Sequence, residues 1–143
     1  MQVQRPPVLV LACGALANEI VALCRLNRWE HVDLQCLPAH LHNRPDTIVP
    51  RIREKLAELA PLYQRILVGY ADCGTGGLLD VVIQEFSRKG CAIERLPGAH
   101  CYEFFAGSES FHALNEEEPG TFYLTDFLLR HFDQLVVKAL GID

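Results

Sequence analysis

The sequence predicts an α/β fold, a single Rossmann-like three-layer domain over residues 1–143 with a mainly parallel sheet of about four strands. Short apolar runs alternate with longer amphipathic segments along the whole chain. The connections between these runs are long enough for helices, which favours right-handed crossovers and parallel strands. Half of the residues are hydrophobic, enough to build a buried core in a domain of this length.

The predicted strands are short runs rich in Val, Ile and Leu. In chain order they are residues 8–12, 32–37, 65–70 and 91–96. Strands of a parallel sheet are covered on both faces, so nearly continuous apolar runs of this kind are typical of them. Residues 121–124 are expected to form one further short strand or extended piece.

The predicted helices repeat apolar residues at a spacing close to 3.6. They comprise residues 14–27, a helix after the cap candidates Asp46 and Thr47, residues 76–89, one short helix within 102–114, and a helix from Thr125 or Asp126 to about Leu140. Leu23 in the first helix and Leu129 and Phe132 in the last are expected to face inward. We expect the last helix to cover one face of the sheet.

Composition and charge argue against several classes of protein. The chain has 18 acidic and 13 basic residues, a net charge of −5, and no basic run that would follow nucleic acid. No apolar run approaches the roughly 20 residues of a membrane helix, and the N-terminus does not have the pattern of a signal peptide. Six cysteines without such a signal indicate a reducing compartment, so we expect a cytoplasmic protein with free thiols.

Three of the cysteines follow predicted strands. Cys13 and Cys73 come directly after the first and third strands, and Cys101 comes a few residues after the fourth. In a parallel sheet these positions meet at the carboxyl edge, where open α/β sheets bind ligands. The other three cysteines lie inside helix or strand patterns and are expected to be small core residues: Cys24, Cys36 and Cys91.

A metal site is the first interpretation of this arrangement, with Cys13, Cys73 and Cys101 as ligands. Soft thiolates favour an iron–sulfur cluster or zinc, and the sequence leaves these two open. The chain has no Cys-x-x-Cys motif, which disfavours a small closed structural zinc site. Ligands from three distant segments instead predict an open site, with His42 or His100 as a fourth ligand or a supporting partner.

Further candidates surround the three cysteines. The side chains expected to take part in catalysis are Glu19, His42, Asp72 and His100. Gly14 and Gly74 directly follow two of the cysteines and would let a bound cofactor approach the backbone closely. A helix start at each of these positions would favour the thiolate form of the preceding cysteine.

Two other functions stay open at this stage. In a metal-free cysteine enzyme, Cys73 would act as a nucleophile with a histidine as base and Asp72 or Glu19 as the orienting group. Alternatively, Cys13 and Cys73 would act as a two-thiol acid and base. In a non-catalytic binding module, the apolar last helix would dock a partner protein or a second copy of the chain, giving a homo-oligomer.

Several segments of the chain resemble the DUF1638 family of uncharacterised bacterial and archaeal proteins. The resemblance rests on Cys13-Gly14 with Leu16 and Glu19, residues 37–45, residues 70–74, His100-Cys101-Tyr102-Glu103 continuing to Gly107-Ser108, and residues 119–125. One departure is that many members carry His-Asp-Cys where this chain has His100-Cys101. Members commonly continue past the position of Asp143, so we expect this chain to be short or truncated.

The resemblance implies a role more than a mechanism. Members of the family are associated with corrinoid-dependent methyltransfer systems for methylated amines. This association implies an enzyme or an accessory protein that handles a metal, a cluster or a methyl group. Its partner would be a small-molecule substrate or another protein.

Overall fold

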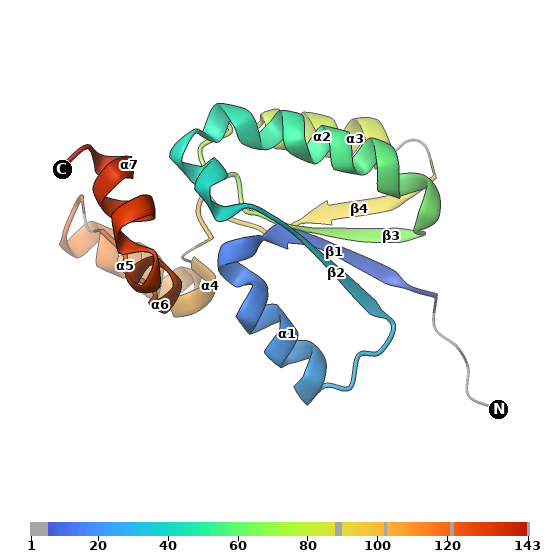
Figure 1. The fold of residues 1–143 in the computed structure, drawn as a ribbon, viewed down its shortest axis with the longest axis horizontal. Coiled ribbons are helices and arrows are strands. Elements are labelled where there is room, and N and C mark those ends of the chain that lie inside the picture. Colours follow the sequence, from blue (N-terminus) through green and yellow to red (C-terminus); the bar gives the residue numbers. More distant parts are fainter. Residues whose placement is uncertain (1–5, 88–89, 102, 121, 143) are drawn as a thin grey trace.

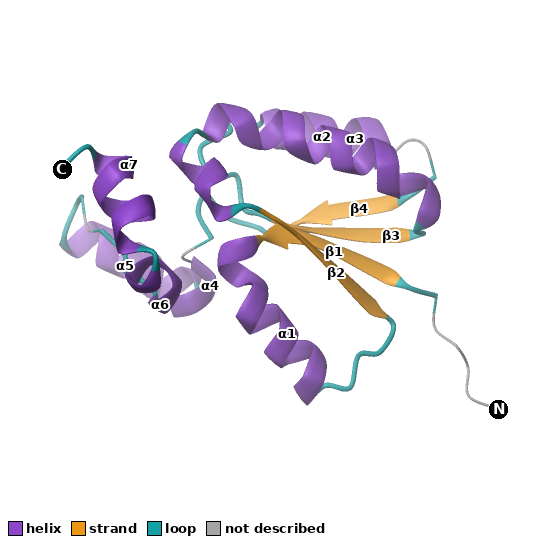
Figure 2. Ribbon diagram, viewed as in Figure 1, coloured by secondary structure: helices purple, strands orange, loops and turns teal. Residues whose placement is uncertain are grey.

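The computed structural model describes residues 6–87, 90–101, 103–120 and 122–142. In this part of the chain four strands form one all-parallel sheet in the order β2-β1-β3-β4 (Figures 1 and 2). The strands are β1 Val8–Cys13, β2 Val32–Leu37, β3 Arg65–Gly69 and β4 Ala92–Arg95. Helices cover both faces of this sheet, which confirms the predicted Rossmann-like α/β fold.

The better-covered face of the sheet carries helices α2 (Ile48–Leu59) and α3 (Leu78–Ser87), as Figure 1 shows. The buried face of α2 follows the helical repeat, with Ile52 and Leu56 fully buried. Alternate residues of the sheet, among them Leu9 in β1, join these side chains in one core.

Helix α1 (Ala17–Leu26) lies on the opposite face of the sheet (Figure 1) and buries none of its residues. Leu23 is 51% exposed, so the prediction of an inward Leu23 is wrong. The physical reason is that, within the described part of the chain, α1 covers this face without a second helix beside it to close a core. Cys36 of edge strand β2 is exposed as well, contrary to prediction, whereas Cys91 is buried and Cys24 is half-buried.

The strand order reverses between β1 and β3. The chain leaves β1 through α1 to the neighbour on one side, β2, and later returns through α2 to the neighbour on the other side, β3. Such a switch point opens a crevice at the carboxyl ends of the two strands, where α/β proteins bind ligands. Cys13 ends β1 at this point, and Cys73 lies a few residues beyond β3.

The C-terminal third of the chain forms a group of short helices beyond the carboxyl ends of the strands (Figure 1). Its elements are α4 Glu103–Ala106, α5 Ser108–Glu117, α6 Asp126–Arg130, a π-helical turn Asp133–Val137, and α7 Lys138–Leu140. The prediction that the last helix covers a face of the sheet is therefore wrong. These helices cover its carboxyl edge instead.

The single helices predicted within 102–114 and after Thr125 are both divided. Gly107, with a φ of 82°, separates α4 from α5, because that backbone conformation cannot continue a right-handed helix. The last segment breaks after α6 at His131, which leaves Leu129 and Phe132 exposed rather than inward. Thr125 caps α6 as predicted, since its hydroxyl accepts a hydrogen bond from the Leu128 amide at 3.2 Å.

Smaller differences concern the ends of elements. Helix α3 begins at Leu78, two residues later than predicted, and the predicted end at Lys89 lies outside the described residues. Thr47 occupies the N-cap position of α2, but its hydroxyl donates to the Arg44 carbonyl instead of capping the helix. Residues 122–124 are not a strand, and position 121 lies outside the described residues. No described helix is both long and apolar enough to cross a membrane.

Candidate functional site

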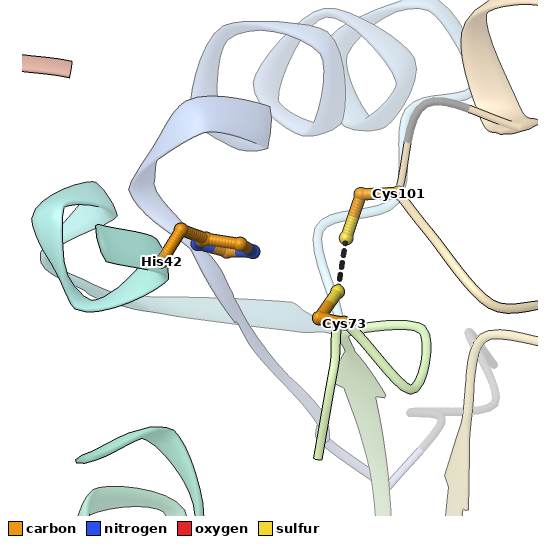
Figure 3. A group of neighbouring side chains, drawn as sticks. All are labelled: His42, Cys73 and Cys101. Carbon is orange, nitrogen blue, oxygen red and sulfur yellow. Dashed lines mark hydrogen bonds between the residues drawn. The ribbon is translucent and has the colours of Figure 1, made fainter. Parts of the chain in front are cut away.

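The structure brings Cys73 and Cys101 together at the switch point. Their Sγ atoms are 3.1 Å apart (Figure 3), well beyond the bond length of about 2.05 Å in a disulfide. The backbone holds the two loops side by side, because the Cys73 amide donates to the Ala99 carbonyl at 2.8 Å and the Asp72 amide donates to the Gly98 carbonyl at 3.2 Å. The approach of the two thiols is thus fixed by main-chain hydrogen bonds.

His42 completes a compact group with these two cysteines. It lies in the 3₁₀ turn Ala39–Asn43 after β2, and its ring points toward the two sulfurs (Figure 3). The imidazole stacks on the ring of Tyr70, with ring centroids 5.7 Å apart and an angle of 9° between the planes. One potential ligand atom from each of His42, Cys73 and Cys101 lies within 4.8 Å of the other two.

Cys13 joins this group from the side of His42. Its Sγ lies 3.5 Å from the His42 Nδ1 atom and accepts a hydrogen bond from the Ala15 amide at 3.4 Å. The sequence predicts Cys13, Cys73 and Cys101 as the three ligands, whereas the compact group in the structure is His42, Cys73 and Cys101. Cys13 contacts Nδ1 of His42, and the Nε2 end of the ring faces the other two cysteines (Figure 3).

The ionisation of the group follows from its hydrogen bonds. Hydrogen bonds from Cys73 and from His42 lower the pKa of Cys101 to about 5 despite its burial. The same hydrogen bond to Cys101, together with burial, raises the pKa of Cys73 far above its usual range. Burial opposes a charge on His42, but Cys101 and Cys13 raise its pKa to about 10. Both shifts favour the charged forms, a thiolate at Cys101 and an imidazolium at His42.

The hydroxyl of Tyr70 is buried and has no hydrogen-bond partner among the described residues. Burial, followed by the charges of Cys13, Cys101 and Cys73, raises the pKa of Tyr70 well above its usual range. The raised pKa keeps the Tyr70 hydroxyl protonated and neutral beside the thiols.

The loop after β3 is held by Asp72. Its carboxylate accepts hydrogen bonds from the Gly76 and Gly77 amides and from the Thr75 hydroxyl, at 3.1, 2.9 and 2.7 Å. These hydrogen bonds lower the pKa of Asp72, and the bond from the Gly77 amide has the largest effect on it. The loop places Cys73 in the left-handed region, at a φ of 51°, a conformation that costs energy and is concentrated at functional sites. Asp72 therefore supports Cys73 through the backbone.

The loop that carries Cys101 is held by Glu103, which is buried. Its carboxylate accepts hydrogen bonds from the Ala99 amide at 3.2 Å and the Ser108 hydroxyl at 3.1 Å. It packs so closely on Gly98 that a Cβ there would lie 2.5 Å from the Glu103 Oε2 atom. Glu103 thus fixes the loop between β4 and α4.

The remaining predicted residues lie farther from the thiols. Glu19 is exposed in the first turn of α1 and is not among the residues that line the site. His100 is exposed at the rim and packs against Phe111. A Cβ at Gly14 would lie only 3.2 Å from the Leu37 carbonyl oxygen. The glycine therefore permits close packing against the end of β2. Gly74 lines the site with a φ of 81°.

A cavity of about 400 Å³ opens directly on the thiols. Its floor is the switch point, with Cys13, Cys73 and Cys101, and its roof is made by apolar side chains of the C-terminal helices. The roof residues are Phe105, Phe122, Phe127, Leu128, Leu135 and Leu140. No pattern in the sequence predicts that these side chains meet above the thiols. The cluster of aromatic residues between 104 and 132 is the signal that could have indicated the roof.

The chain matches a known protein family over a region that contains most of the site. No curated protein matches the chain. The model of a family described as "Protein of unknown function (DUF1638)" matches residues 36–143, which include His42, Cys73 and Cys101. Cys13 and Gly14, to which the resemblance also extends, precede the matched region. Because the match covers well over half of the chain, the protein belongs to the DUF1638 family.

Proposed function

We propose that the protein binds one zinc ion at the switch point through Cys73, Cys101 and His42, in an open site that faces a ligand cavity. The observation that carries this proposal is that the three potential ligand atoms lie within 4.8 Å of one another. Two cysteines and one histidine form a donor set that catalytic zinc sites use, with the fourth position left to a ligand.

The distances favour a single ion over an iron–sulfur cluster. Two sulfurs on one tetrahedral zinc, with bonds of about 2.3 Å, are ~3.8 Å apart, close to the 3.1 Å between Cys73 and Cys101. Cysteines that bind different irons of a cluster are held farther apart by the cluster itself. The histidine in the group also suits zinc.

Cys13 supports the zinc site through His42 in this proposal. The metal-binding histidines of proteins commonly use their second nitrogen for a hydrogen bond that fixes the ring. Cys13 supplies such a contact at Nδ1, at 3.5 Å. The stacked ring of Tyr70 fixes the plane of the imidazole from the other side. Four segments of the chain thus orient one histidine and two thiols.

The test is metal analysis of protein purified without oxygen. The wild-type protein is expected to hold about one zinc per chain, and Cys73→Ser, Cys101→Ser and His42→Ala are each expected to lose it. Cys13→Ser should keep the metal with an affinity about 10- to 100-fold lower, as for partners that orient a ligand. A folded wild-type protein that binds neither zinc nor iron would refute the proposal.

Matched controls come from the same parts of the chain. Cys36→Ser changes an exposed cysteine at the end of β2, and His40→Ala changes an exposed histidine in the same 3₁₀ turn as His42. Both variants should retain zinc at the wild-type level. Iron with visible absorbance in place of zinc would instead indicate a cluster.

A second candidate function is a metal-free cysteine enzyme. The observation that favours it is the Cys101 thiolate, whose pKa is lowered to about 5, beside the charged His42. Such a pair resembles the activated cysteine and histidine of nucleophilic enzymes. In this second candidate function the nucleophile would be Cys101, whereas the sequence suggests Cys73, because the lowered pKa belongs to Cys101.

Alkylation separates the two functions. In metal-free protein near neutral pH, iodoacetamide should modify Cys101 before Cys73, which mass spectrometry of peptides can measure. Prior addition of zinc should protect Cys101 if the zinc proposal is correct. Equal labelling of Cys101 and the exposed Cys36 would remove the support for an activated thiolate.

A further inference from the structure

Above the thiols and His42, the described walls of the cavity carry no acidic side chain and no lysine or arginine. The titratable groups that line it are the thiols and His42 of the site itself, with His100 exposed at the rim. Away from the metal site itself, a phosphate, a carboxylate or an ammonium group inside would have no side chain of opposite charge as a partner, which makes its desolvation unfavourable.

The neutral polar groups of the cavity are mostly committed elsewhere. The side-chain amide of Asn43 donates to the Gln134 carbonyl at 3.4 Å, and the Thr125 hydroxyl accepts from the Leu128 amide. The rest of the roof is aromatic and aliphatic. The body of a ligand in this cavity would therefore be held by apolar contacts and not by a hydrogen-bond network.

The metal site defines the reactive end of such a ligand. Two thiolates and an imidazole leave one zinc position, and a borderline-soft ion with soft ligands accepts sulfur readily.

We infer that the cavity binds a small, uncharged, mainly apolar organic thiol whose sulfur binds the zinc. This inference rests on the proposed zinc site and adds the class of ligand. The ligand's thiol loses its proton to solvent and a sulfur–zinc bond forms, so no oxidant or reductant is required. A volume of about 400 Å³ is within the range of small-molecule pockets and suits a ligand of modest size.

The test uses the protein reconstituted with Co²⁺ in place of zinc and three probes. Cyclohexanethiol should change the visible cobalt spectrum and add a sulfur-to-cobalt charge-transfer band. Mercaptosuccinate, a thiol with two carboxylates, should bind at least 10-fold more weakly because the cavity offers no compensating charge. Cyclohexanol, which has the same apolar body without the sulfur, should add no such band.

A pair of variants locates the ligand. Leu135→Lys places a positive charge in the roof and should shift the preference toward mercaptosuccinate. Leu129→Lys adds the same charge at an exposed position outside the cavity and should leave the preference unchanged. Circular dichroism verifies that each variant is folded.

The outcomes separate this inference from the proposed function. Failure of the wild-type protein to bind Co²⁺ or Zn²⁺ would refute the metal site itself. Bound metal with a spectrum that cyclohexanethiol does not change would overturn the ligand class while the metal site stands. Equal affinity for cyclohexanethiol and mercaptosuccinate would do the same, whatever the variants show.

Discussion

At the scale of single residues, the position of Cys101 depends on the contact between Gly98 and Glu103. Gly98 has a φ of 95°, and any Cβ there would meet the Glu103 carboxylate at 2.5 Å. Gly98→Ala is therefore expected to lower the free energy of unfolding by about 1–3 kcal/mol. It should also weaken zinc binding, because the same loop carries Cys101. Urea unfolding and metal titration of the variant measure both effects.

The matched control is Gly120→Ala. Gly120 has a similar φ of 86°, but nothing lies within 4 Å of where its Cβ would be. It should show the cost of the backbone conformation alone, with zinc affinity unchanged. If both variants lost stability equally and neither affected zinc, Glu103 would have no special role in holding the loop.

Sequence reasoning at this scale identifies residue types better than partnerships. The sequence singles out Cys13, Cys73 and Cys101 because their types and positions after strands are visible in the chain. It offers His42 and His100 equally, as a fourth ligand, a supporting partner or a catalytic residue, because the direction of a side chain in a loop or 3₁₀ turn has no periodic signal. Tertiary contacts orient the His42 imidazole, namely its stacking on Tyr70 and its contact with Cys13.

At the scale of elements, α1 and α2 differ in how much they stabilise the fold. Leu56 of α2 is fully buried, whereas Leu26 of α1 is 82% exposed. Leu56→Ala should lower the free energy of unfolding by about 2–5 kcal/mol, since it removes core contacts and leaves a cavity. Leu26→Ala should change it by less than about 0.5 kcal/mol. Chemical denaturation of the two variants makes the comparison, and similar losses would contradict it.

The central strands and helices could be read from the sequence because hydrophobic periodicity is a local property. The strand predicted at 32–37 has the same bounds in the structure, and α2 buries the face that its repeat predicts. The C-terminal helices are different, because they are short and interrupted at Gly107 and His131. Their amphipathic pattern shows that one side is apolar but not which surface it covers.

At the scale of the whole molecule, the sheet core and the C-terminal helices should differ in local stability. β1 and β3 are central strands with buried side chains, whereas the last helices leave Leu129, Phe132 and Leu140 exposed. Amide exchange should therefore be slowest in β1 and β3 and faster in α6 and α7. Hydrogen exchange followed by mass spectrometry measures this order. Equal protection of α6 and β1 would mean that the C-terminal helices fold as one unit with the core.

The sequence by itself determined the parallel α/β fold and the family resemblance that the match over residues 36–143 confirms. It also determined that Cys13 and Cys73 would arrive at one sheet edge, because a strand's carboxyl end is fixed once the sheet is parallel. The tertiary structure alone decided that His42 joins Cys73 and Cys101, and that apolar helices roof the cavity above them. Those contacts join segments far apart in the chain, and their geometry depends on loop conformations and packing that no local pattern encodes.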